Sequence, residues 1–239
     1  MPDEPLIERR PFRELPHEDL GWLKTRHHFL PLRTGRDNRC QDKWGCLRGW
    51  DDEEIAPNRG FGLQRRANME IVTYVRDGAI AHRDNLGNEG RIEAGSVQVV
   101  SAGAGIRHAE SNPEPAPARI FRIWIAPASP GGAPAWGVQP CRAADHAGCL
   151  VAIASGFDGD NDALPLRARA RVLNARIAAG EQIKHALHDP LLAYLVPSFG
   201  SIDVNGTMID ARDGAEISDV DEITITAIED ADIILVDIF

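Results

Sequence analysis

The chain has 239 residues, of which 43% are hydrophobic and 26% are charged, a composition typical of a globular protein with one large or two small domains and not of a disordered chain. The formal net charge is −10, and Arg alternates with Asp and Glu along most of the chain, which disfavours a nucleic-acid partner because phosphate binding needs a basic stripe. The apolar runs, such as Ile233–Val236, are far shorter than the ~18 residues that a membrane helix needs, so no membrane partner is expected.

The first twelve residues, MPDEPLIERRPF, lack the apolar segment of a secretory signal, and a cytoplasmic location is therefore expected. The cysteines are Cys40, Cys46, Cys141 and Cys149, and none of them forms a CxxC pair. In a reducing compartment such spacings predict thiols rather than a disulfide framework or a zinc site.

Short β patterns rich in Val, Ile and Tyr, bounded by Gly, Asn, Asp or Pro, recur along the chain as they do in β-sandwiches and barrels. The segment FGLQRRANMEIVTYV, residues 61–75, is expected to enter a small barrel as a strand. No long amphipathic pattern predicts a helix, so the expected fold class is all-β. The clearest strands, in chain order, are predicted at residues 70–76, 78–83, 96–101, 119–126, 191–196, 200–205, 215–218, 222–227 and 231–237.

A segment rich in Pro and Gly, APASPGGAPAWGVQP at residues 126–140, predicts the domain boundary. We expect an N-terminal domain over residues 1–127, a linker over 128–140 and a C-terminal domain over 141–239. The order of strands and Gly-containing turns is similar on the two sides of this boundary, which suggests two copies of one β-sandwich unit.

Polar residues recur on one predicted strand face and mark the candidate site. Because strand side chains alternate, Gln64, Arg66 and Glu70 share a face if no bulge intervenes. His108 and Glu110, two residues apart, can both reach one cation, which a transition metal would bind at about 2.0 to 2.2 Å. On spacing alone, however, a His-x-Glu pair is more often a hydrogen-bonded surface pair than a metal site.

The residues around this pair resemble a known family. GFG at 60–62, ANMEIVTYV at 67–75, HRDNLGN at 82–88 and SAGAGIRHAE at 101–110 are similar to the N-terminal half of pirin-type bicupins, which include bacterial proteins similar to quercetin 2,3-dioxygenase. The resemblance extends more faintly to VNGTMIDARDGAEIS at 204–218. It implies two cupin domains packed together, with one metal ion, usually iron, in the N-terminal barrel.

The resemblance also implies a ligand set, in which a His-x-His pair and a His-x-Glu pair hold the metal. The second pair corresponds to His108 and Glu110, but the first corresponds to Gln64 and Arg66. Arg cannot be a ligand, because its guanidinium stays protonated and offers no lone pair. We therefore hypothesise that an Arg66–Glu110 ion pair replaces the metal, with Gln64 bonded to His108 or to the carboxylate. The alternative is that Arg66 extends out of the barrel to water.

Two functions follow from these alternatives. The first is a small-molecule-binding protein without a metal cofactor, whose cavity residues Gln64, Arg66, Glu70, His108 and Glu110 take a small anionic or aromatic molecule. The second is a quercetin 2,3-dioxygenase-like enzyme with a reduced ligand set for iron, nickel or zinc, in which Gln64 or Glu70 joins the His-x-Glu pair and waters complete the shell. The sequence indicates no oligomeric state.

The other histidines are expected to have structural or surface roles. His185 and His188 lie three residues apart without a partner motif, and His27 and His28 precede the predicted barrel.

Overall fold

The computed structural model describes residues 6–29, 44–141, 148–187 and 192–239, and these are mostly β-strands. The exception is one 3-10 turn at Phe12–Glu14. In these ranges no helix is long and apolar enough to cross a membrane. The all-β fold class is confirmed. Cys40, His188 and Leu191, the first residue of a predicted strand, lie outside the described residues.

The strands form two compact units, which are described separately. The described residues of Pro16–Cys141 and Leu164–Ala168 make up the N-terminal unit. Its larger sheet has the order β12 (Ala135–Pro140), β9 (Ser96–Ser101), β6 (Glu70–Asp77), β11 (Ala118–Ile125), β4 (Leu47–Ile55), β3 (Leu23–Phe29), β2 (His17–Asp19). Its smaller sheet has the order β5 (Gly60–Arg66), β10 (Ile106–Ser111), β7 (Ala79–Asp84), β8 (Glu89–Glu93), and Leu164–Pro165 (β14) also belongs to this unit.

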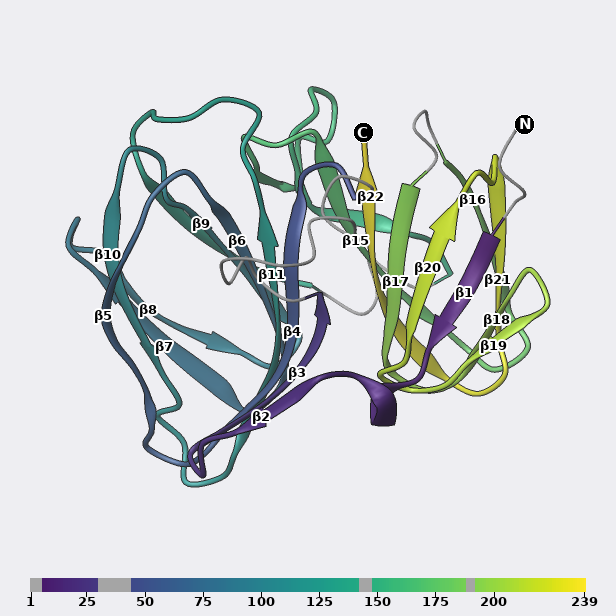
Figure 1. Ribbon diagram of the computed structural model, residues 1–239, viewed down its shortest axis with the longest axis horizontal. Helices are drawn as coiled ribbons and strands as arrows, with labels where there is room; N and C mark the ends of the chain where they lie inside the picture. Colours follow the sequence, from purple (N-terminus) through teal and green to yellow (C-terminus); the bar gives the residue numbers. More distant parts are fainter. Residues whose placement is uncertain (1–5, 30–43, 142–147, 188–191) are drawn as a thin grey trace. The chain divides into compact units, whose positions relative to one another are not determined.

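The described residues of Met1–Leu15, Arg142–Ala163 and Arg169–Phe239 make up the C-terminal unit. One of its sheets contains, in order, β1 (Leu6–Arg10), β20 (Gly214–Ser218), β17 (Leu192–Phe199), β22 (Ala231–Ile238), β15 (Ala170–Ile177) and β13 (Val151–Ser155). The other has the order β16 (Gln182–Ala186), β21 (Glu222–Ala227), β18 (Ile202–Val204), β19 (Thr207–Ile209). Figure 1 shows the two sheets of each unit facing one another.

The two units repeat one topology, strand for strand. The order β9-β6-β11-β4 in the N-terminal unit corresponds to β20-β17-β22-β15, and β5-β10-β7-β8 corresponds to β16-β21-β18-β19. Each of these eight C-terminal strands is thus the counterpart of the N-terminal strand numbered eleven lower. The internal repeat predicted from the order of strands and turns is a repeat of this topology.

The interiors of the two units differ in polarity. The C-terminal unit packs a continuous apolar cluster that includes Ile183 on β16, Val204 on β18 and Ile223 and Ile225 on β21. In the N-terminal unit, the corresponding strands β7 and β10 bury His82, His108 and Glu110, while apolar clusters flank them. The fold itself does not require polar side chains at these places, since the sister unit fills its interior with aliphatic ones.

The unit boundaries differ from the predicted domains of residues 1–127 and 141–239 with a linker over 128–140. Ala135–Pro140 is the edge strand β12, paired with β9 so that Trp136 lies opposite Val100. Pro140 is tolerated there because an edge strand leaves backbone groups unpaired on one side. Leu6–Arg10, at the start of the chain, pairs with β20 in the C-terminal unit.

The predicted strand over residues 61–75 is divided by a corner. β5 ends at Arg66, β6 begins at Glu70, and Asn68 between them has a φ of 51°. Asn is one of the few residues that adopt this left-handed conformation readily. Side-chain alternation therefore does not continue from Gln64 and Arg66 to Glu70.

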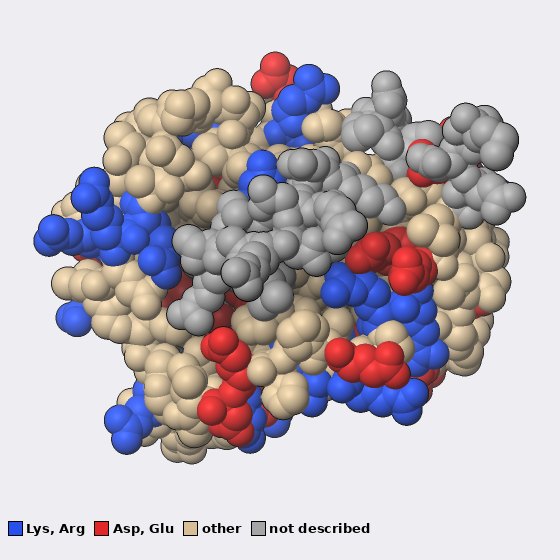
Figure 2. All heavy atoms as spheres, in the orientation of Figure 1, with Lys and Arg blue, Asp and Glu red and all other residues tan. Residues whose placement is uncertain are grey.

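Charged side chains of both signs are mixed on the surface. Figure 2 shows Lys and Arg next to Asp and Glu, among uncharged residues, on the visible face of the described chain. This mixture agrees with the alternation of charges along the sequence.

Candidate functional site in the N-terminal unit

Three neighbouring strands of the smaller sheet bring the polar residues together. In the β10–β7 register, Glu110 lies opposite His82 and His108 lies opposite Asp84. In the β10–β5 register, His108 lies opposite Gln64. The register shifts between His108 and Glu110, where β5 advances three residues for two on β10. This β-bulge lets Phe61 line the same cavity as Gln64.

Glu110 is the most heavily bonded group of the site. Its Oε1 accepts a hydrogen bond from Gln98 Nε2 at 2.6 Å, and its Oε2 accepts one from Arg122 Nη2 at 2.8 Å. Burial alone would raise the pKa of Glu110, but the charge of Arg122 and the imidazoles of His108 and His82 hold it well below its usual range. The proposed Arg66–Glu110 ion pair is wrong, because the salt-bridge partner of Glu110 is Arg122.

Arg122 projects from β11 into the interior and joins two carboxylates. Its Nη1 donates to Glu53 Oε1 at 3.1 Å, and its guanidinium lies 4.7 Å from the centre of the Phe61 ring. Burial alone would lower the pKa of Arg122, but the negative charges of Glu53, Glu110 and Asp51 outweigh this effect and raise the pKa. Burial raises the pKa of Glu53 to about 7, although Arg122 acts in the opposite direction.

Arg66 lies at the same cavity and has a different partner. Its Nη2 donates to Gln64 Oε1, and its Nη1 donates to the Arg65 carbonyl at 3.2 Å. The guanidinium lies 5.4 Å from the centre of the Trp124 ring. Among the described residues no carboxylate is within ion-pair distance of Arg66. Burial, and then repulsion from Arg122, lower its pKa.

A cavity of about 10 Å³ lies between these side chains, which is room for about one water molecule. It is lined by Phe61, Gln64, Arg66, Ile71, His108, Glu110, Arg122 and Trp124. Four of the predicted site residues, Gln64, Arg66, His108 and Glu110, are thus brought together.

Glu70 does not line this cavity, contrary to the sequence-based expectation. It is fully buried at the start of β6, where its Oε2 accepts hydrogen bonds from Ser101 Oγ and from the Arg167 backbone N–H at 3.3 Å. The corner at Asn68 separates Glu70 from the face that Gln64 and Arg66 share.

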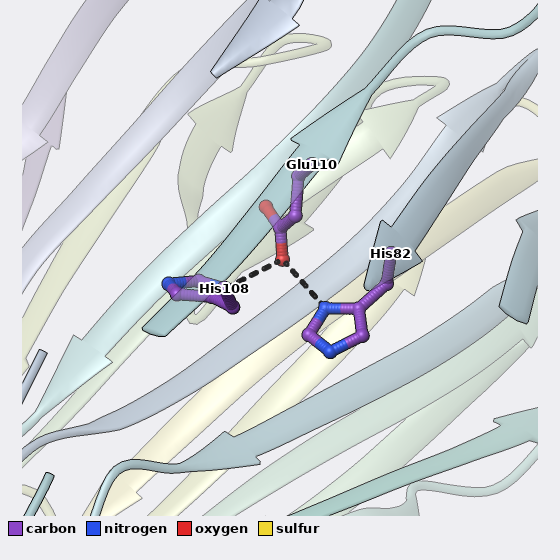
Figure 3. A group of neighbouring side chains, drawn as sticks. All are labelled: His82, His108 and Glu110. Atoms are coloured by element: carbon purple, nitrogen blue, oxygen red, sulfur yellow. Dashed lines mark ion pairs between the residues drawn. The ribbon is translucent and has the colours of Figure 1, made fainter. Parts of the chain in front are cut away.

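His82 is a site residue that the sequence analysis missed. Its Nδ1 lies 3.7 Å from Glu110 Oε1, as does Nδ1 of His108, and Figure 3 shows both rings directed at this carboxylate. His82 Nε2 is 3.3 Å from Asp84 Oδ2. The His82 ring stacks on Trp136, with the ring centres 4.9 Å apart and the planes at 11°.

Arg122 and Gln98 were also missed, and Trp136 lay in the predicted linker. Trp136 Nε1 donates to Gln98 Oε1 at 2.8 Å, which directs the Gln98 amide NH₂ at Glu110. Each of the missed polar residues interrupts a predicted apolar strand, as Arg122 does in ARIFRIWI. A polar residue inside such a strand was the signal that could have identified them.

Three other described histidines, His27, His28 and His185, have carboxylate or ring contacts. His27 Nδ1 lies 2.7 Å from Asp51 Oδ1, and His185 Nε2 lies 2.8 Å from Asp237 Oδ2. His28 is fully buried, with its ring centre 5.8 Å from that of Trp50.

The residues do not fit the four-ligand metal site that the family resemblance implies. Two of the four ligand positions hold Gln64 and Arg66, and these two side chains are hydrogen-bonded to each other. The Gln64 amide oxygen is therefore already an acceptor, and Arg66 adds a positive charge where the ion would be.

Two similar all-β units with a polar site in the first define a bicupin, and comparisons with known proteins give the family. Residues 8–125 match the Pirin family model, and residues 152–238 match the model of the quercetinase C-terminal cupin domain. A pirin-like protein of Caulobacter vibrioides is 55% identical over 232 residues, which cover 97% of this chain and 99% of that protein. The chain belongs to the pirin family.

Two further matches come from Escherichia coli. A protein named quercetin 2,3-dioxygenase is 28% identical over 98% of this chain and 99% of its own length. The crystal structure of bacterial pirin YhhW in complex with nickel(II) matches with a TM-score of 0.87 and 29% identity, covering 98% of this chain and 99% of that one.

Proposed function

We propose that this protein is a small-molecule-binding bicupin that takes a small anionic ligand in the N-terminal cavity, where the metal site of the family is degenerate. The observation that carries the proposal is Arg66. It is a half-buried cation that lines the cavity, and no described carboxylate is within ion-pair distance of it.

The Arg66 guanidinium has room for a closer anionic partner. Arg122 is in ion-pair contact with Glu53 and Glu110, whereas Arg66 is affected by the charge of Glu110 without being in ion-pair contact with it. A buried charge without a counter-charge is costly, so an anion bonded to Arg66 would stabilise the site. The Gln64 amide and the His108 imidazole offer further hydrogen bonds beside it.

The size and walls of the cavity define the ligand class. A carboxylate or phenolate group is larger than the water-sized cavity, so binding requires Arg66, which is half-buried at its edge, to move outward. The rings of Phe61 and Trp124 line the cavity and can contact a flat ligand. We therefore propose a small aromatic acid.

The nickel and dioxygenase chemistry of relatives does not extend directly to this cavity. Dioxygen chemistry needs a redox metal with open positions. The Gln64–Arg66 pair, in place of two ligands, argues against a metal at the family position and favours the binding function.

The experiment is calorimetric titration of the full-length, EDTA-treated protein with benzoate and with benzamide, its neutral analogue. We expect benzoate to bind and benzamide not to, and we expect Arg66→Gln to weaken benzoate binding by about tenfold or more, the loss of a charge-assisted hydrogen bond. Arg65→Gln is the matched control, because Arg65 is exposed on the same strand. Equal binding of benzoate and benzamide, equal binding by Arg66→Gln and the parent, or no binding by the folded protein would each reject the proposal.

A further inference from the structure

We propose that His82, His108 and Glu110 form a three-ligand site for a divalent transition metal, displaced from the family position toward strand β7. This inference goes beyond the anion-binding function and does not depend on it. In this site His82, from β7 on one side of β10, takes the place of the two ligands that are missing from β5 on the other side.

The donor atoms of the three residues are of the kind and spacing that one ion requires. One ligand atom from each residue lies within 4.8 Å of the other two, and each imidazole Nδ1 is 3.7 Å from Glu110 Oε1. Ligand atoms on a tetrahedral ion with bonds of 2.0 to 2.2 Å lie about 3.3 to 3.6 Å apart, so small side-chain movements would complete the geometry. Two imidazoles and one carboxylate suit zinc, nickel or iron.

The His82 ring is oriented as in a metal ligand, with Nε2 toward Asp84 and Nδ1 toward the cluster. Its Nε2 faces Asp84 Oδ2, which can only accept, so the ring proton is assigned to Nε2 and the Nδ1 lone pair points at the cluster. Asp84 is itself fixed, because its Oδ1 accepts from the backbone N–H groups of Leu86 and Asn88 at 2.9 and 3.1 Å. Histidines that ligate metals typically donate their other ring N–H to such a carboxylate.

The described contacts leave Nδ1 of His82 and Nδ1 of His108 without hydrogen bonds. His82 is 2% exposed and His108 is 7% exposed. In the described part of the chain, Nδ1 of each ring is buried without a hydrogen-bond partner, because 3.7 Å to Glu110 is too long for a hydrogen bond. Two buried nitrogen atoms without hydrogen bonds cost free energy, and a metal ion bound to both would satisfy them.

Glu110 remains able to bind while its other contacts persist. Arg122 occupies Oε2, and Gln98 donates one hydrogen bond to Oε1. A carboxylate oxygen has two lone pairs, so Oε1 keeps one for an ion. Gln98 and Arg122 would hold the carboxylate in place, as outer partners of metal ligands do.

The site overlaps the Arg66 cavity only in part. His108 and Glu110 line that cavity, whereas His82 does not. The sister unit supports a specific role for this cluster, because its corresponding strands β18 and β21 bury Val204, Ile223 and Ile225.

The experiment uses full-length protein stripped with EDTA and then titrated with Zn²⁺, Ni²⁺ and Co²⁺. We expect one equivalent to bind, with a visible Co²⁺ absorption band and with paramagnetic shifts of two imidazole resonances. His82→Ala should abolish this binding. Asp84→Asn, which keeps the backbone hydrogen bonds of the turn, should weaken it by roughly 10- to 100-fold.

Two further variants separate this site from its alternatives. His185→Ala, which removes a carboxylate-paired histidine of the C-terminal unit, is the control and should bind the metal as tightly as the parent. Gln64→Ala tests whether the family position is used instead, because Gln64 could be a ligand only there. Uptake that survives both His82→Ala and His108→Ala, uptake that depends on Gln64 rather than His82, or no uptake by folded protein would each overturn the inference. Benzoate binding measured in EDTA, and metal binding measured in Arg66→Gln, allow the two proposals to fail independently.

Discussion

At the scale of single residues, Arg122 is the cation on which the interior of the N-terminal unit depends. It is buried, and one of its nitrogens donates to Glu110 and another to Glu53. The sequence analysis correctly required a counter-charge for Glu110 but chose Arg66. Side-chain parity on one strand identified Arg66, whereas the true partner comes from the facing sheet, and its identity depends on how the two sheets pack.

Arg122→Met should therefore destabilise the protein strongly. We expect a loss of roughly 3 to 5 kcal/mol in the free energy of unfolding, because removing one partner leaves buried carboxylates unpaired. Adding Glu110→Gln should recover part of this loss, and Arg66→Met should cost less than about 1 kcal/mol since Arg66 has no described ion pair. Urea unfolding of the parent, of these three variants and of Glu110→Gln alone measures these values. Strictly additive losses for the Arg122–Glu110 pair would contradict the network.

Glu53 should make stability depend on pH. Burial raises its pKa in the folded protein to about 7, whereas the unfolded chain has the ordinary value near 4.5. Between these two values the folded state holds more protons than the unfolded state, so the free energy of unfolding falls as the pH rises and then levels off. Arg122, Asp51, Glu110 and His27 are the charged groups that act on Glu53.

Glu53→Gln keeps an oxygen that can accept from Arg122 but does not titrate. We expect the variant to lose less stability than the parent between pH 5 and pH 7, approximately the interval between the two Glu53 pKa values. Urea unfolding at intervals of half a pH unit measures both curves. Parallel curves would show that Glu53 does not titrate in this range.

At the scale of elements, the approach of β5 to β10 sets the site. The sequence predicted one strand over residues 61–75 and the alternation that turns Gln64 and Arg66 inward. It did not reveal the corner at Asn68 or the β-bulge, because each depends on local backbone geometry at one residue. It also did not reveal β12, whose Pro and Gly content obscured an edge strand that supplies Trp136.

Gly60→Ala tests the close approach of the two strands. A Cβ at Gly60 would overlap the backbone of Glu110 and Ser111, so β5 would have to move away from β10. We expect a loss of roughly 1 to 3 kcal/mol in the free energy of unfolding, as for overpacking, together with weaker ligand binding at the cavity. Gly62→Ala, where a Cβ meets nothing within 4 Å, should be neutral or slightly stabilising. Equal losses in both variants would show that the contact at Gly60 is not what matters.

At the scale of the whole molecule, the all-β fold in two similar units was predictable from turn residues and strand periodicity, and the family and its bicupin fold from the resemblance of motifs such as SAGAGIRHAE. It was harder to predict from the sequence which of the two units has a polar interior. Strand patterns look alike whether the interior holds His82 and Glu110 or Val204 and Ile223, until the registers of β7, β10 and β5 place the polar residues together.

Because apolar clusters flank the site, ligand residues should be exchangeable without loss of the fold. The double substitution Gln64→His with Arg66→His should rebuild the ligand set implied by the family, since Gln64 already lies opposite His108. We expect Ni²⁺ to bind at least about tenfold more tightly than to the parent, because removing a nearby like charge relieves more than the roughly 1.4 kcal/mol that a tenfold change requires.

His82→Ala added to this double variant distinguishes the rebuilt position from the site proposed on β7. If the family position is restored, the triple variant keeps its nickel, whereas the single His82→Ala variant of the parent does not. Calorimetry on the four proteins, with Gln64→Ala plus Arg66→Ala as the matched control, gives the comparison. If the double variant binds nickel no more tightly than this control, then β5 does not hold its side chains where they could bind a metal. The cavity in this protein would then differ in shape from the family site, and not only in the two ligands.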